Sequence, residues 1–396
     1  MKLLQQIGAV TTMNLRSLPQ RVGTSLVIVI GIAGVVAVLV SVLAMSTGMI
    51  RTMENSGRDD RAIVMRNGSA SETGSALPRD SARLIADTVG IRRDAEGKPI
   101  ASAEALRLLN LNRKADGAEV NVALRGVGPQ LAAVRPELKI VEGRMFRPAV
   151  TELIVGKAAH EQFAGLNIGD TVRTRGATWT VVGVFTAGGD SHESTLMTDA
   201  ETLLAAQQRS SFQSVTVLLD SPAAFQKFKD AISANPALAV DVSREREYYR
   251  QQSQTMSQVI SVIAYVVGGI MAVGAIFSAL NTMYSAVSSR LREIATLRAI
   301  GFGATAMVMS VLAEALVLAL IGGVIGAALA WLFFNGHTVS TSGGGPALGH
   351  LIFQLSVSPA LMTVGIVWAC AIGVVGGLFP AVRAARLPVA TALRAI

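Results

Sequence analysis

The chain has 396 residues, of which 51% are hydrophobic and only 16% are charged, so part of it is expected to lie in lipid. Its net charge of +8 would suit nucleic acid, but the basic excess gathers at the ends of apolar stretches, which argues against nucleic-acid binding. A single cysteine, Cys370, excludes an internal disulfide framework.

The first apolar stretch is uncharged from residue 22 to residue 50, between Arg21 and Arg51. A segment of this length can cross a hydrocarbon core of about 30 Å. A cleaved signal peptide is the alternative, but its apolar region spans only about 7–15 residues. Residues 1–50 are therefore predicted to form a cytoplasmic N-terminus and a first transmembrane helix.

Residues 51–243 have mixed charge and read as a water-soluble domain on the external side. Two β-α-β patterns are separated by about a hundred residues, which predicts a ferredoxin-like lobe that carries an insertion. The expected strands are 61–66, 104–112, 214–219 and 239–242, and the expected helices are 79–89 and 222–234. The insertion is predicted to be rich in strands, because Gly-Asp at 169–170 and Gly-Ala at 176–177 are typical of hairpins.

Residues 244–287 are predicted to form one long helix. At 1.5 Å per residue it would extend about 66 Å, more than twice the thickness of the hydrocarbon core. The surplus length carries several glutamines, namely Gln251, Gln252, Gln254 and Gln258. We expect this part to project outward as a stalk that continues into the second span.

Two further spans follow, at 304–334 and within 359–396, which also holds the cytoplasmic C-terminus. The loop between them, 335–358, contains neither Lys nor Arg and is expected outside the membrane. Small residues at a spacing of four predict close helix packing within the subunit or, alternatively, a dimer seam. They are Gly322, Gly326 and Ala330 in the third span, and Gly365, Ala369, Gly373 and Gly377 in the fourth.

Residues 288–303 form a short charged segment between two apolar ones. Val287, Leu291 and Ile294 share one helical face, and Gly301 and Gly303 follow where such a helix would end. A short amphipathic helix at this place suits docking against a partner at the membrane surface. A helix that lies on lipid headgroups without a partner is the alternative.

Three motifs of this chain resemble the MacB/FtsX (type VII) family of ABC transporter permeases. The sequence N-T-M at 281–283, followed by R-x-R-E-I and a glycine turn, is similar to the coupling helix of that family. Segment 380–396 resembles the family's closing segment, and the runs 141–146, 153–156 and 166–185 resemble its β-rich periplasmic module. The resemblance implies an α-helical membrane protein with four transmembrane helices and an α+β periplasmic domain.

The resemblance also implies how such a chain works. The coupling helix would bind a MacB-type ATP-binding subunit through Arg290, Arg292, Glu293, Ile294, Leu297 and Arg298. This chain has no Walker A motif, so ATP and Mg²⁺ are expected on a separate partner, with neither a cofactor nor an enzymatic activity here. Two permease subunits, identical or different, would pair in a bacterial inner membrane with both termini cytoplasmic, and ATPase closure would move the periplasmic domains.

The external task has several candidates. Export through a periplasmic adaptor and an outer-membrane duct is the first expectation. Lipoprotein extraction, as in the LolC/LolE branch, is the second, and regulation of cell-wall hydrolases, as by FtsX, is the third. The size of the external domain favours the first two. A membrane-anchored sensor without an ATPase is a different class of answer.

Other chemistry-bearing residues give weaker indications. Glu314, an acidic residue within the third span, is expected to contact another helix or the coupling helix, with a proton relay as the alternative. Asp190, Ser191, His192 and Glu193 are the residue types of a catalytic triad, but adjacent positions do not converge on a nucleophile, so an exposed loop is expected. The scattered histidines form no metal-ligand spacing.

Overall fold

The computed structural model describes residues 3–17, 21–341 and 351–386. Two compact units divide the chain. The helical unit comprises Met1–Thr47, Gln258–His337 and Leu355–Ile396, and the sheet unit comprises Gly48–Ser257 and Thr338–Gln354. Helices α2 (Val22–Ser56) and α8 (Glu245–Ser289) have residues in both units.

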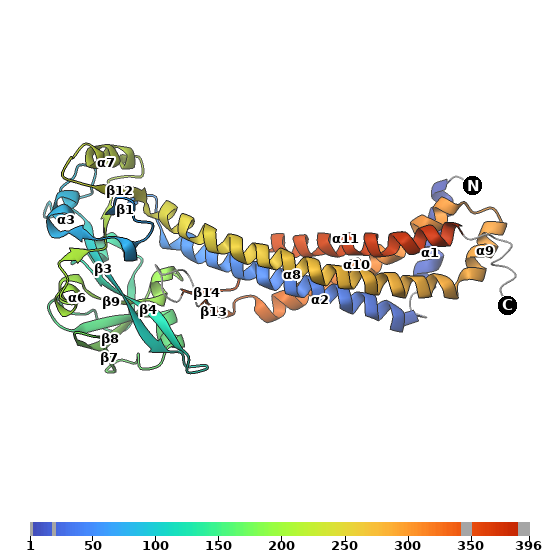
Figure 1. Cartoon of the computed structure of the whole chain (residues 1–396), viewed down its shortest axis with the longest axis horizontal. Coiled ribbons are helices and arrows are strands. Elements are labelled where there is room, and N and C mark those ends of the chain that lie inside the picture. Colours follow the sequence, from blue (N-terminus) through green and yellow to red (C-terminus); the bar gives the residue numbers. More distant parts are fainter. Residues whose placement is uncertain (1–2, 18–20, 342–350, 387–396) are drawn as a thin grey trace. The chain divides into compact units, whose positions relative to one another are not determined.

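One half of the sheet unit has the predicted ferredoxin-like topology (Figure 1). Its four strands follow the order β12-β1-β11-β3, and every neighbouring pair is antiparallel. Helix α3 lies between β1 and β3 in the chain, and α7 lies between β11 and β12, so each β-α-β pattern closes as expected. The bounds are β1 Arg61–Arg66, α3 Arg79–Ala86, β3 Ala101–Asn112, β11 Ser214–Leu218, α7 Ala224–Ser233 and β12 Val240–Arg244.

The insertion extends the same sheet in the order β3-β4-β9-β6-β8-β5, with β7 paired to β8. Its strands are β4 Glu119–Val127, β5 Lys139–Gly143, β6 Glu152–Gly156, β7 Thr171–Arg173, β8 Thr178–Thr186 and β9 Leu196–Asp199. Shorter elements are η2 Glu72–Gly74, α4 Leu131–Val134, α5 Lys157–Gln162, η3 Ser191–Ser194 and α6 Ala200–Ala206, and strands β2 Leu77–Pro78 and β10 Ser211–Phe212 form a separate pair. The predicted hairpin around 176–177 is the β7–β8 pair.

A network of buried ion pairs crosses the sheet unit. Three arginines and three glutamates belong to it, each at most 4% exposed, namely Arg61, Arg125, Arg135, Glu72, Glu104 and Glu245. Arg125 bonds to Glu72 at 2.7 Å and to Glu104 at 2.5 Å. Glu245, the first residue of α8, forms ion pairs with Arg61 at 2.5 Å and with Arg135 at 2.8 Å. A buried charge is tolerated only when it is paired in this way, so the network fixes the first turn of α8 against the sheet.

Removing one member of this network is expected to be costly. The substitution E245Q would leave the guanidinium groups of Arg61 and Arg135 buried without their shared carboxylate. We expect it to lower the free energy of unfolding by about 3–5 kcal/mol. Urea unfolding, followed by the fluorescence of the buried Trp179 after Trp331→Phe and Trp368→Phe substitution, measures the change.

The matched control is E201Q, which breaks an ion pair with Arg79 whose two side chains are 43% and 57% exposed. Exposed pairs contribute at most about 1 kcal/mol, so E201Q should unfold almost as the parent protein does. Equal effects of E245Q and E201Q would contradict the structural role given to the buried network.

The carboxyl group of Glu72 makes the sheet unit sensitive to acid. Burial by itself would raise its pKa, but the Arg125 guanidinium outweighs burial and lowers the pKa from 4.5 to about 2. Stability from ionised Glu72 is therefore complete above pH 4.5 and is lost as the pH falls towards 2. Compared with the parent, E72Q should be less stable at neutral pH and lose less stability over this window, as measured by urea unfolding at stepwise lower pH. Parallel pH profiles would contradict this.

The helical unit contains α1 (Leu3–Ser17), α9 (Leu291–Ala299), α10 (Ala304–Phe334), α11 (Pro359–Arg386) and parts of α2 and α8. Among the described residues, four helices are long and apolar enough to cross a membrane: α2, α8, α10 and α11. These are the four predicted spans. Helix α2 continues past Arg51 to Ser56, and α8 is one helix of 45 residues, as predicted for 244–287.

The small residues of the third and fourth spans pack within the chain. A Cβ atom added to Gly373 or Gly377 of α11 would lie 2.4 Å from Ala319 Cβ or 2.6 Å from Ala315 Cβ of α10. Gly326 faces α2 instead, where an added Cβ would lie 2.4 Å from the carbonyl oxygen of Ala33. These contacts give the stripes a role in packing within the subunit, because only glycine allows the backbones to come so close.

Two features differ from the expected organisation. The loop 335–358 contributes the antiparallel strands β13 (Thr338–Thr341) and β14 (Leu351–Gln354), which belong to the sheet unit, and Ile352 lies in its apolar core. Helix α1 was not anticipated at all. Most of the resemblance at 380–396 falls on 387–396, outside the described residues.

Candidate functional site

The α8–α9 junction turns where Arg290 leaves the helical conformation, at φ −110° and ψ 14°. Its side chain is buried in the helical unit beside α10, and its Nη1 atom lies 3.2 Å from Glu314 Oε2. Its Nη2 atom donates to the hydroxyl of Ser17 on α1. Both charged side chains are less than 8% exposed, so the pair links α1, α10 and the start of α9.

A Schellman motif fixes the other end of α9. Gly301 takes the left-handed conformation, at φ +99°, and its N–H donates to the carbonyl of Arg298 at 3.1 Å. The N–H of Phe302 donates to the carbonyl of Leu297, also at 3.1 Å, and both side chains pack against the core of the helical unit. The length and exit direction of this nine-residue helix are therefore set by its own sequence.

Helix α1 holds the junction from a third side. The carbonyl oxygen of the Gln6 side chain accepts from the N–H of Gly303 at 3.3 Å, and the amide of Asn14 donates to the hydroxyl of Ser310 at 2.7 Å. Val10, between them, is only 2% exposed. With Ser17, these residues follow a spacing of four, four and three, which marks one face of a helix. This spacing is the signal by which the sequence could have revealed α1.

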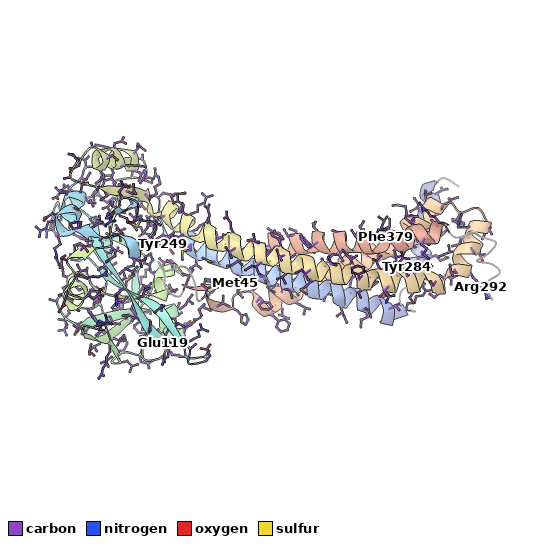
Figure 2. All side chains as sticks on the ribbon, in the orientation of Figure 1. Met45, Glu119, Tyr249, Tyr284, Arg292 and Phe379 are labelled. Carbon is purple, nitrogen blue, oxygen red and sulfur yellow. The ribbon has the colours of Figure 1, made fainter. Side chains whose placement is uncertain are left out.

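The six residues nominated for docking divide into two groups. Arg290 and Ile294 are buried, and Leu297 is partly buried against the core of the helical unit. Arg292 and Glu293 are exposed, and Arg298 is partly exposed. Figure 2 shows Arg292 on α9.

The exposed side of α9 forms a short stripe of polar and apolar residues. Arg292, Thr296 and Ile300 follow one another at a spacing of four, which places them on the same side of the helix, with Glu293 beside them. Ile300 is 71% exposed, which is high for a large apolar side chain. We call Arg292, Glu293, Thr296 and Ile300 the outer face of α9.

The Arg290–Glu314 pair should behave as one unit in a mutant cycle. Either single change, R290M or E314M, leaves one buried charge without its partner, whereas the double change removes both. We expect the double variant to be more stable than the sum of the two single effects predicts, with a coupling energy of roughly 1–3 kcal/mol. Thermal unfolding of the detergent-solubilised protein measures it. R292M, at an exposed position of α9, is the control, and additive single effects would contradict the pairing.

The residues at 190–193 do not form the exposed loop expected from the sequence. That expectation is wrong, because Asp190, Ser191, His192 and Glu193 are all at most 8% exposed. They lie in and next to η3, which is covered by neighbouring segments of the sheet unit and is hydrogen-bonded to them. Among the described residues, no group of three or more His, Cys, Asp or Glu side chains could hold a metal ion.

Two family models account for most of the chain. The model of the MacB-like periplasmic core domain matches residues 22–235, and the model of the FtsX-like permease C-terminal region matches residues 265–389. The chain belongs to the MacB/FtsX family of ABC transporter permeases. It is a membrane protein with a MacB-like periplasmic core domain, as the sequence motifs indicated.

Curated relatives carry the name macrolide export ATP-binding/permease protein MacB. The protein of Rhodopirellula baltica is 26% identical over 94% of this chain, and that of Bdellovibrio bacteriovorus is 25% identical over 92%. This chain spans 59% and 58% of their respective lengths. Among solved structures, the periplasmic region of MacB from Actinobacillus actinomycetemcomitans covers 54% of this chain, with 97% of its own length aligned, 17% identity and a TM-score of 0.36.

Proposed function

We propose that this chain is the membrane subunit of an ABC exporter and that the outer face of α9 docks in a groove of a separate ATP-binding subunit. ATP and Mg²⁺ would be bound by that partner. The observation that carries the proposal is that both ends of α9 are fixed in place. The Arg290–Glu314 ion pair fixes its start, and the Schellman motif at Gly301 fixes its end. A helix with fixed ends transmits a displacement to the helices it contacts, because its ends do not unwind when a docked subunit moves it.

Helix α8 is the element through which such a displacement would be transmitted to the sheet unit. It ends at Ser289, next to α9, and its first residue, Glu245, is clamped by Arg61 and Arg135 of the sheet unit. Backbone hydrogen bonds along a helix resist bending. Closure of the ATPase dimer would thus act on the periplasmic core domain through α8, with two permease subunits in each assembly.

The direction of transport and the membrane are further parts of the proposal. The names of the relatives support export. A periplasmic adaptor and an outer-membrane duct are part of the proposal as additional partners. Basic residues near both termini and on α9, such as Arg16, Arg292 and Arg383, support an inner-membrane protein with cytoplasmic termini.

Reversing a charge on the outer face of α9 should uncouple the ATPase. In the substitution R292E, a carboxylate replaces a cation that a docking groove would complement, and like charges at an interface cost several kcal/mol. We expect the recovery of the ATP-binding subunit in co-purification to fall at least about tenfold, while the variant folds normally. E293R, the opposite reversal at the next residue, should have the same effect.

R107E is the matched control, since it makes the same charge change at an exposed position of the sheet unit. It should co-purify with the ATP-binding subunit as the parent does. If R292E and E293R also retain the partner and the transport activity, α9 is not the docking site.

A further inference from the structure

The short helix η3 (Ser191–Ser194) is buried where three chain segments of the sheet unit meet. These segments are the end of α2, the start of α8 and the strand β14. Each continues along the chain into the helical unit, so together they make three of the four connections between the two units, and the fourth is at the start of β13. All contacts described below lie within the sheet unit.

A hydrogen bond joins η3 to each of the three segments. The N–H of Ser191 donates to the hydroxyl of Ser56, the last residue of α2, at 2.8 Å. The hydroxyl of Tyr249 on α8 lies 3.2 Å from His192 Nε2.

The third segment is held by a reciprocal pair. The N–H of Ile352 on β14 donates to the hydroxyl of Ser194 at 3.0 Å, and that hydroxyl donates to the carbonyl of Ile352 at 3.2 Å. The partner residues on all three segments, like η3 itself, are fully or almost fully buried.

Other bonds fix η3 to the sheet. Glu193 Oε1 accepts from the hydroxyl of Thr186 at 2.5 Å and from the N–H groups of Ala187 at 2.7 Å and Gly189 at 2.9 Å, all at or after the end of β8. Gly156 at the end of β6 lies so close that an added Cβ would be 2.2 Å from the carbonyl oxygen of Glu193. The turn is therefore held by two strands of the insertion.

The imidazole of His192 has both nitrogens engaged. Asp190 Oδ2 lies 2.9 Å from Nδ1, and Asp190 Oδ1 accepts from the backbone N–H of His192. With the ring proton directed to Asp190, Nε2 is the acceptor for the hydroxyl of Tyr249. Burial makes each of these bonds expensive to leave unmade, so the turn and its partners should keep or lose their geometry together.

We propose that η3 is the positioning junction of the periplasmic core domain, which holds the three connections in one register and passes the displacement of any of them to the sheet. This deepens the proposed function and rests on it for the source of the displacement. In this role His192, Ser191 and Ser194 are positioning residues that contact no substrate.

The junction can be tested without the ATPase, in the full-length protein in lipid nanodiscs. The substitution Y249F removes one hydroxyl and leaves the ring. If η3 positions all three segments, two other N–H groups should exchange with deuterium about tenfold faster in Y249F. They are that of Ser191, bonded to Ser56 of α2, and that of Ile352 on β14, bonded to Ser194 of η3. Peptide-resolved hydrogen–deuterium exchange measures both.

T198V is the control, because it removes an equally buried hydrogen bond, from the hydroxyl of Thr198 to the carbonyl of Glu152, inside the same sheet. It should leave the exchange of Ser191 and Ile352 unchanged. Loosening in Y249F that is confined to Tyr249 and His192, or equal loosening in T198V, would overturn the junction.

A second measurement separates this proposal from the proposed function. Y249F combined with S194A should retain the ATP-binding subunit and its basal ATP hydrolysis, yet lose at least about tenfold in transport, unlike T198V. If transport is unchanged, the junction is overturned while the permease assignment stands. If the parent protein retains no ATP-binding subunit, the proposed function fails, and the exchange experiment still decides the junction.

Discussion

The buried ion pair between Arg290 and Glu314 is the constraint on which the membrane-side architecture depends. Charged side chains among apolar helices are stable only when each has a partner, and this pair joins the first residue after α8 to the first half of α10. The same bond keeps Arg290 from continuing α8 outward. The ion pair of Arg290 with Glu314 therefore sets the turn into α9 and, with it, which residues of α9 lie on the outer face.

The sheet unit obeys the same rule at the opposite end of α8. Helix α8 begins at Glu245, a buried anion that lies between two buried arginines. The residue that follows the helix, Arg290, is a buried cation paired with Glu314. Neither end can shift without breaking a pair. Helix η3 adds hydrogen bonds that tie α8 to α2 and β14, at three of the places where the chain enters or leaves the sheet unit.

Much of the fold could be predicted from local patterns. The ferredoxin-like lobe followed from the order of strand-like and helical runs in two β-α-β patterns, and the four apolar helices followed from long apolar runs. The strands β13 and β14 were missed, since eight residues on a sequence rich in Gly and Ser give a weak signal. Helix α1 was missed because only the charge of this segment was considered. The helical spacing of Gln6, Val10, Asn14 and Ser17 was overlooked.

The sequence by itself determined the family, the four spans and the position of the helix between the second and third of them, because each depends on residues close together in the chain. It could not determine which side of that helix is exposed. Arg290 and Arg292 look alike in sequence, yet Glu314 on another helix draws the first inward and leaves the second exposed. The burial of Asp190 to Ser194 was likewise decided by tertiary structure, since its partners Ser56, Tyr249 and Ile352 lie more than fifty residues away.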